Sequence, residues 1–273
     1  MKSKGRVVFG YFLIICGILL PLVAFSSMSY REIMANRNYK EFVKDKKTLT
    51  REVENYNEKV LKGDGNIIDP FKNEDYEGYY DIEGLDKDEV FAYLIIPKLE
   101  MKKPIYLDAT YDHLDWGVAQ VEGTSLPLGG MSTRSVIAGH RGWWGDLMFY
   151  NVEKLEAGDE ILIDGRTGLL KYEVVNKEVI DPSEWQRVLP IENRDMITLL
   201  TCHPKRPPRP KRLLINAQRV EEVPEKKVES KKITKDKNTS NLKYAVYGIT
   251  LVGWISFVIV FRKMIGFLRG KRR

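Results

Sequence analysis

The chain has 273 residues, of which 43% are hydrophobic and 30% are charged. This composition is that of an ordinary globular protein, and the length allows one or two domains. The net charge of +6 would suit an acidic partner such as nucleic acid. However, the residues before Val7 contribute +3 and those after Phe261 contribute +6, which leaves −3 for the stretch between them. The basic excess is terminal, so we expect no nucleic-acid partner.

The first apolar run is Val7–Phe25, with 19 residues and no charge. As a helix it would reach roughly 28 Å, close to the ~30 Å hydrocarbon core of a bilayer. A cleaved signal peptide is the alternative, but the sequence VAFSS lacks the two small residues of an A-x-A-like cleavage site. The pattern therefore predicts an uncleaved transmembrane signal anchor over residues 1–28.

A long, mostly polar region follows the anchor. Residues 29–61 are rich in helix formers and contain no proline, with apolar side chains at loosely helical spacings, which predicts one or two amphipathic helices. Residues 63–87 are acidic and turn-forming, which predicts a long loop. Its aspartates do not have the spacing of a twelve-residue calcium loop, so a solvated loop is the better interpretation. Residues 29–87 form the predicted helical extension and loop.

From Val90 the periodicity changes to that of strands. Seven short runs rich in Val, Ile, Leu and Tyr are separated by Gly, Pro or Asp, and a helical patch interrupts them near Tyr111–Trp116. The runs are Val90–Pro97, Lys103–Thr110, Thr133–His140, Asp159–Arg166, Leu169–Ile180, Asp195–Cys202 and Lys211–Val220. Seven or eight strands at this spacing predict a mostly β domain, a closed barrel or a sandwich, over residues 88–220.

The end of the chain contains a tether and a second apolar run. Residues 221–240 carry 11 charges and no aromatic residue, so we expect residues 221–242 to be a disordered linker. Tyr244–Phe261 has 18 apolar or uncharged residues. A buried core helix is disfavoured by this length and by the basic flank. We therefore expect residues 243–273 to form a transmembrane helix and a basic tail.

Lys and Arg outside the distal end of each run place both termini in the cytoplasm by the positive-inside rule. Residues from about 27 to 242 then lie on the far side of the membrane. Cys16 is inside the first run, so Cys202 is the only cysteine of the exported part. It has no internal disulfide partner, which indicates either an intermolecular bridge or a reactive sulfur.

A reactive cysteine needs a histidine brought near it by the fold. His203 adjoins Cys202, but neighbouring side chains of a strand point to opposite faces, so His203 is poorly placed to pair with that sulfur. His140 ends a predicted strand and opens the loop RGWWGD, where its side chain can face a groove. His113 lies in the helical patch, where a surface or half-buried position is the simpler interpretation.

Positive charge follows the cysteine. A guanidinium on an adjacent strand can stabilise the oxyanion formed when sulfur attacks a carbonyl. Arg212 begins the strand expected to run antiparallel to that of Cys202, on the same face, whereas Arg206 and Arg209 lie in the proline-rich loop between them. A buried structural cysteine is the alternative. A zinc site is disfavoured because no C-x-x-C or H-x-x-x-H spacing is present. We expect neither a metal nor an organic cofactor.

Four stretches of the chain together resemble the sortases, the membrane-anchored cysteine transpeptidases of Gram-positive bacteria. They are YLIIPKLEMKKPIY (93–106), GTSLPLGG (123–130), SVIAGHRG (135–142) and TLLTC (198–202) followed ten residues later by RLLI. The resemblance implies a closed eight-stranded β-barrel, with Cys202 as nucleophile, His140 as acid/base partner and Arg212 as the arginine for substrate and oxyanion. It also implies an LPXTG-like sorting signal as substrate and an amine as acceptor.

The C-terminal membrane helix and the sequence Asp69-Pro70-Phe71 are similar to class C sortases, which polymerise pilins through lysine isopeptide bonds. In that class the corresponding segment is a lid, in which Asp meets the catalytic arginine and the ring covers the cysteine. The loop between Cys202 and Arg212 departs from the class pattern, since it is one residue longer and lacks the usual Asn. Arg209 therefore remains a candidate for the role of Arg212. Anchoring of proteins to cell-wall peptide, and a non-catalytic membrane-tethered scaffold, are the alternative functions.

Overall fold

The computed structural model describes residues 2–44, 49, 51–63, 67–72, 82, 85, 86, 88–142, 146–220 and 235–270. The chain divides into two units, of which one contains the N-terminal part of helix α1 together with helix α4, and the other contains the β-strands. Most of the predicted linker 221–242 and much of the predicted loop 63–87 lie outside the described residues.

Helices α1 (Lys2–Lys44) and α4 (Lys237–Leu268) each contain one of the two apolar runs. Both are long and apolar enough to cross a membrane, and their most apolar 18-residue windows have mean hydropathies of 2.6 and 2.0. Helix α1 continues without a break past residue 28, where the predicted anchor ends, and α4 begins before residue 243. Residues 237–242, the last six of the predicted linker, are therefore helical.

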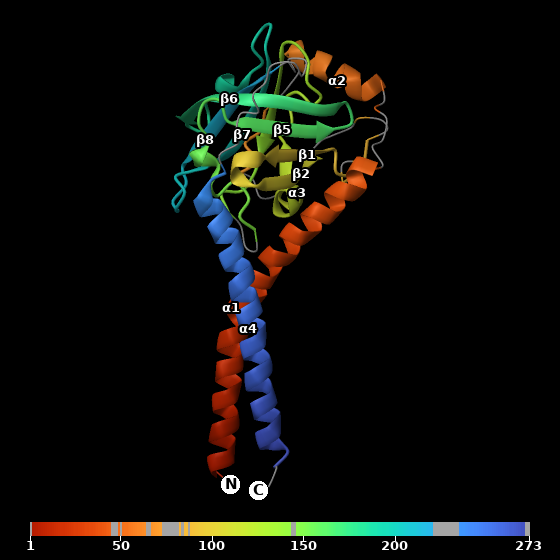
Figure 1. Ribbon diagram of the computed structural model, residues 1–273. Coiled ribbons are helices and arrows are strands. Elements are labelled where there is room, and N and C mark those ends of the chain that lie inside the picture. Colours follow the sequence, from red (N-terminus) through yellow and green to blue (C-terminus); the bar gives the residue numbers. More distant parts are fainter. Residues whose placement is uncertain are drawn as a thin grey trace. The chain divides into compact units, whose positions relative to one another are not determined.

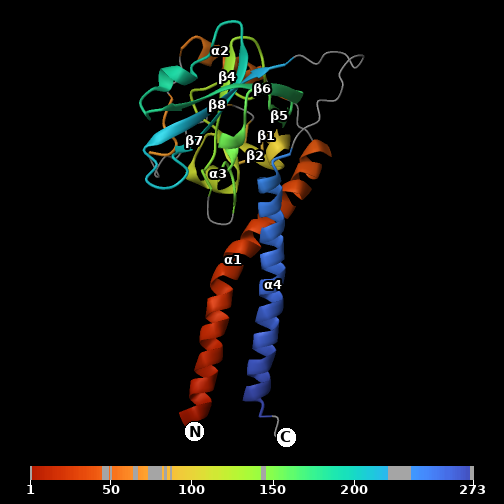
Figure 2. The same cartoon turned by 60° about the vertical axis from the view of Figure 1, so that its left-hand side comes forward.

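The apolar parts of α1 and α4 run side by side in both views (Figures 1 and 2). A Cβ atom on Gly253 would lie 2.8 Å from Cδ1 of Leu22, which is closer than real contacts allow, so the glycine permits this approach. The hydroxyls of Ser29 and Thr250 are 3.1 Å apart. Small residues and hydroxyl pairs of this kind are typical of helices that pack within a bilayer.

The second unit contains a closed eight-stranded barrel, as the resemblance to sortases implies (Figure 1). Around the barrel the order is β1-β2-β3-β4-β7-β8-β6-β5, with β2–β3 and β4–β7 paired parallel and the other pairs antiparallel. The strands are β1 (Ala92–Ile96), β2 (Met101–Leu107), β3 (Val118–Gln120), β4 (Thr133–Ala138), β5 (Glu160–Gly165), β6 (Gly168–Ile180), β7 (Asp195–His203) and β8 (Lys211–Arg219).

Short helices connect or flank these strands. They are α2 (Arg51–Leu61), α3 (Tyr111–Trp116) and the 3-10 helices η1 (Pro97–Leu99), η2 (Val152–Lys154) and η3 (Trp185–Val188). Helix α3 begins where Thr110 Oγ1 accepts a hydrogen bond from the His113 backbone N–H at 3.4 Å, which is an N-cap. The patch at Tyr111–Trp116 is therefore helical, as its sequence predicts.

Helix α2 fastens the N-terminal extension to the barrel. Its Val53 is fully buried within the core cluster of the barrel. The Asn57 side chain accepts a hydrogen bond from the Leu126 N–H at 2.7 Å and donates one to the Leu126 carbonyl at 3.3 Å. The residues after α2, which include Asp69–Phe71, therefore start from a fixed point on the barrel.

Two apolar clusters occupy the two faces of the strands. Alternate residues of β7 and β8, such as Leu199 and Ile215, fill the barrel interior. Their neighbours, such as Leu200 and Leu214, form a second cluster on the outer face, with Val188 of η3 over it. Because side chains of a strand alternate between faces, Cys202 and Arg212 share the outer face with this second cluster.

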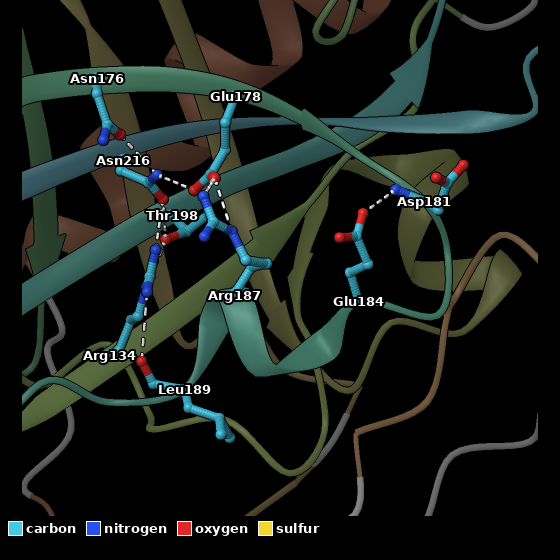
Figure 3. A network of polar contacts seen from close by, with 9 residues as sticks. All are labelled: Arg134, Asn176, Glu178, Asp181, Glu184, Arg187, Leu189, Thr198 and Asn216. Atoms are coloured by element: carbon cyan, nitrogen blue, oxygen red, sulfur yellow. Dashed lines mark hydrogen bonds and ion pairs between the residues drawn. The ribbon is translucent and has the colours of Figure 1, made fainter.

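A polar network lies farther along the same outer face (Figure 3). Arg134 of β4, which is 4% exposed, donates to Thr198 Oγ1 at 2.9 Å and to Asn216 Oδ1 at 2.6 Å. It also donates to the Leu189 carbonyl at 3.3 Å, just after η3. At the rim, Arg187 of η3 is paired with the Glu178 carboxylate. The network joins the four strands β4, β6, β7 and β8 and holds the β6–β7 connection against the barrel.

Replacing Arg134 with Met should therefore destabilise the barrel by about 2–4 kcal/mol, because buried partners lose a charged donor. Chemical unfolding followed by tryptophan fluorescence measures the change. Arg187→Gln is the matched control, since this exposed arginine belongs to the same network and its loss should change the unfolding midpoint little. Equal shifts for the two variants would contradict the assignment of the stabilisation to the buried part of the network.

Candidate active site

The pairing of three strands brings Cys202, His140 and Arg212 together. Cys202 and Arg212 are directly opposite each other in the antiparallel β7–β8 pair. In the parallel β4–β7 pair Ala138 is opposite Leu200, and the Gly139 N–H donates to the Leu200 carbonyl at 3.1 Å. Continuing this register by one same-face step puts His140 beside Cys202.

Gly139 is needed for His140 to reach this position. A Cβ atom on Gly139 would lie 2.7 Å from the Phe149 ring and 3.0 Å from Val118. The backbone just before the histidine therefore packs directly against an aromatic ring, with no room for a side chain. His140 itself is 6% exposed, and its ring lies 5.7 Å from the ring of Tyr111 at the start of α3.

Arg212 holds a carboxylate from the N-terminal extension. Its Nη2 is 2.8 Å from Asp69 Oδ2 and its Nε is 3.2 Å from Asp69 Oδ1, a bidentate arrangement with both side chains buried. The Nη1 donates to the carbonyls of Arg209 and Lys211 at 3.3 and 3.0 Å, which fixes the guanidinium plane. The Asp69–Arg212 contact that the resemblance implies is thus present in the structure.

Phe71 packs over the row of side chains formed by His140, Cys202 and Arg212, which we call the catalytic row. Its ring centroid lies 5.9 Å from that of His140 and 5.4 Å from the guanidinium carbon of Arg212. The ring packs on the outer apolar cluster, and the Phe71 N–H donates to Asp69 Oδ1 at 3.0 Å. Together with buried Pro70, these residues make a compact turn against the row. We call residues 69–71 the lid segment, after the role that the resemblance implies.

Burial favours the neutral forms of the Cys202 thiol and the His140 imidazole. Burial raises the pKa of the Cys202 thiol, and the Asp69 carboxylate raises it further, against the lowering effect of Arg212, Arg209 and Arg141. Burial, together with the charge of Arg209, lowers the pKa of His140 to about 4. With the lid segment in place, the neutral thiol and the neutral imidazole are therefore the favoured forms.

The other candidate residues lie elsewhere. His113 is held in α3, with Nδ1 2.9 Å from Asp108 Oδ1 and its ring stacked 4.9 Å from that of Tyr106. The β7 alternation directs His203 away from Cys202. Arg209 is outside the strands, and its Nη2 donates to the Lys205 carbonyl at 3.0 Å. The charge of Arg209 lowers the pKa values of His140 and Cys202, but Arg209 is not paired with any residue of β7.

Two neighbours of the site were not predicted from the sequence. Asp115 Oδ1 of α3 lies 3.7 Å from His140 Nε2 and would pair with the imidazolium. Arg141 is 1% exposed, although an arginine beside a loop usually lies in solvent, and only its place directly after His140 could have indicated a role. Within the described part of the chain, no three His, Cys, Asp or Glu side chains gather in a way that could hold a metal ion.

Comparison with known proteins identifies the family of this barrel. The family model of the sortase domain matches residues 94–220. Sortase C-3 from Streptococcus pneumoniae is 35% identical, with a TM-score of 0.58 over 71% of this chain and 90% of that one. Sortase C1 from Streptococcus agalactiae is 30% identical, with a TM-score of 0.59 over 70% of this chain and 97% of that one.

Sortase A of Bacillus anthracis is 27% identical over 118 residues, which are 43% of this chain and 54% of that protein. The chain therefore matches about half the length of this curated relative. The closed barrel, with a cysteine, a histidine and an arginine near one end of its outer face, is that of a cysteine enzyme of the transpeptidase class. The chain belongs to the sortase family, and its structural neighbours include many sortases C.

Proposed function

We propose that this protein is a pilin-polymerising sortase of class C, which cleaves an LPXTG-like sorting signal between Thr and Gly. The observation that carries the proposal is the bidentate Asp69–Arg212 contact, with Phe71 packed over the row that contains Cys202 and His140. A closed lid segment on a sortase barrel supports class C, and the similarity to sortases C from two streptococci supports it independently.

In the proposed acylation, His140 takes the proton of the Cys202 thiol while the sulfur attacks the Thr carbonyl of the sorting signal and a C–S bond forms. Arg212 stabilises the negative charge that develops on the carbonyl oxygen. The Thr–Gly C–N bond then breaks, and His140 delivers a proton to the departing Gly amine. The product of this half-reaction is a thioester on Cys202.

In the second half-reaction an amine attacks the thioester. The C–N bond forms, the C–S bond breaks, and the proton released by the amine passes through His140 to the Cys202 sulfur. A lysine side chain of another pilin gives an isopeptide bond, whereas a cell-wall peptide amine gives an anchored protein. Products longer than one substrate unit support polymerisation, and products that never exceed one unit would support anchoring instead.

The proposed cellular setting follows from the two apolar helices. Helices α1 and α4 anchor the protein in the membrane of a Gram-positive bacterium, with both termini in the cytoplasm and residues 88–220 as the catalytic domain outside. The basic residues beyond both helices support this orientation. Residues 29–87 serve as extension and lid, and residues 221–242 as the linker to the second helix.

Opening the lid segment should make Cys202 reactive. Asp69→Asn removes a carboxylate that raises the thiol pKa, so the pH profile of labelling by a thiol reagent should move to lower pH. A lower thiol pKa raises the thiolate fraction at any pH below that pKa, so labelling at pH 7 should be faster than in the parent protein. The measurement is the labelling rate of Cys202 as a function of pH.

Two further variants distinguish the effect of the Asp69 charge on Cys202 from the shielding of Cys202 by the Phe71 ring. Phe71→Ala uncovers the site but keeps the Asp69–Arg212 pair, so it should raise the labelling rate with a smaller shift of the pH profile. Asp86→Asn removes a negative charge from an exposed position of the extension and should leave both unchanged. An unchanged rate in both Asp69→Asn and Phe71→Ala would contradict the lid assignment.

A further inference from the structure

The cationic cluster, formed by Arg141, Lys205 and Arg209, lies beyond the catalytic row. Arg141 follows His140, whereas Lys205 and Arg209 belong to the connection from β7 to β8. Phe71 of the lid segment packs on the outer apolar cluster. In the proposed reaction the acyl donor replaces the lid segment on that cluster, which leaves the cationic cluster for the acceptor.

The charge of the cationic cluster is only partly balanced. Glu153 contacts both Arg141 Nη2 and Lys205 Nζ, the latter at 3.2 Å. Within the described part of the chain Arg209 has no carboxylate within ion-pair distance. One carboxylate therefore offsets three cations, and the excess positive charge lies at a partly buried position next to Cys202, whose pKa it lowers.

Arg141 has unused donors although it is buried. The side chain is 1% exposed, and neither its Nε nor its Nη1 has a hydrogen-bond partner among the described residues. The Nε of Arg209 is also buried without a partner. Buried donors of charged groups are normally satisfied, so their presence indicates a place for an acceptor group that arrives with a ligand.

The backbone and side-chain positions of the cationic cluster are restricted. Pro204, Pro207, Pro208 and Pro210 restrict the backbone of the β7–β8 connection. Lys205 Nζ is further held by Asn151 Oδ1 at 3.3 Å and by the face of the Tyr150 ring at 3.7 Å. A ligand would meet groups that are already in place, which lowers the entropy cost of binding.

From these observations we infer that the cationic cluster binds a carboxylate of the acyl acceptor, so that the enzyme selects amines with a carboxylate close by. The inference rests on the proposed function and specifies the acceptor of that same site. A carboxylate-free lysine would be repelled by the cluster, because like charges placed together disfavour a complex. A neighbouring carboxylate removes this repulsion and can use the free donors of Arg141 and Arg209.

The same environment favours the reactive form of an attacking amine. Lys205 is an amine already placed there, and burial together with the charges of Arg141 and Lys154 lowers its pKa. Burial at this position disfavours the charged form of an acceptor lysine in the same way. Its neutral nitrogen can then attack the thioester, while its carboxylate remains bound.

Acceptor binding to the full chain carrying Cys202→Ala, in detergent micelles, tests the inference without any catalysis. The two probes are a lysine pentapeptide with Glu on each side of the lysine and the same peptide with Gln instead. The acidic peptide should bind about fivefold or more tightly, the size of one favourable ion pair. A lysine peptide with a free α-carboxylate, compared with its amide, distinguishes a chain-terminal carboxylate from a side-chain one.

Arg209→Gln combined with Lys205→Gln should remove the preference for the acidic peptide. Arg206→Gln is the matched control, because it removes an exposed charge from the same loop and should keep the preference. Equal affinity for the acidic and neutral peptides in the parent protein, or a preference that the double variant keeps, would overturn the inference.

The active enzyme gives the second measurement. Thioester formation with a sorting-signal peptide reports the proposed function, and the yield ratio of the two acceptor products reports the acceptor site. A missing thioester would refute the proposed function alone, whereas a thioester resolved equally well by both acceptors would refute only the acceptor inference.

Discussion

Replacing Cys202 with Ala should abolish turnover of a sorting-signal peptide and all covalent product. The reaction proceeds through a bond to this sulfur, and the methyl group of alanine offers no alternative nucleophile. The loss of turnover is measured by chromatography, which follows the release of the Gly-containing leaving peptide.

Cys16→Ala is the matched control for this variant. Cys16 is the other cysteine of the chain and lies within α1. Its replacement should leave turnover unchanged. Retained turnover in Cys202→Ala, or equal losses in the two variants, would remove Cys202 from the mechanism.

Replacing Arg212 with Gln should lower the acylation rate by about 10² to 10³, the effect of losing an oxyanion donor. The variants belong in an Asp69→Ala background, because Arg212 also holds the lid segment shut and its loss would otherwise open the site as well. Arg212→Lys keeps the positive charge but loses the planar guanidinium. Its acylation rate should therefore lie between that of the Asp69→Ala parent and that of Arg212→Gln. Burst kinetics of thioester formation give the rate.

Arg209→Gln in the same background separates the two candidate arginines. Arg212 is directly opposite Cys202 in the β7–β8 register, whereas Arg209 influences the site only through its charge. Acylation by Arg209→Gln should therefore stay within a fewfold of the parent. A larger loss of acylation rate in Arg209→Gln than in Arg212→Gln would show that Arg209, and not Arg212, stabilises the oxyanion.

Much of the barrel could be predicted from the sequence because its strands carry local signals. The run Asp195–Cys202 is apolar and rich in Ile, Leu and Thr, and β7 ends one residue beyond it. Strand β3 was not predicted, since the three residues Val118–Gln120 are too short for periodicity to show. Its place is set by pairing with β2 and β4, which no local pattern encodes.

The site was predictable to the extent that its residues are close in sequence. Cys202 and Arg212 are ten residues apart on paired strands, and alternation alone places them on one face. Asp69 and Arg212 are separated by 143 positions, so only the resemblance to class C sortases suggested their contact. The burial of Arg141 and its link to Glu153 depend on tertiary packing, and no sequence pattern indicated them.

The central claim is that Cys202 carries the acyl group at the outer face of the barrel. The most direct test incubates the full chain carrying Asp69→Ala with an LPXTG-containing peptide, quenches it in acid, and measures the intact mass and the modified fragment. A mass increase equal to the peptide up to its Thr, located on Cys202 and removed by hydroxylamine, is the expected result. An unmodified Cys202 while the peptide is cleaved, or an adduct on any other residue, would contradict the account.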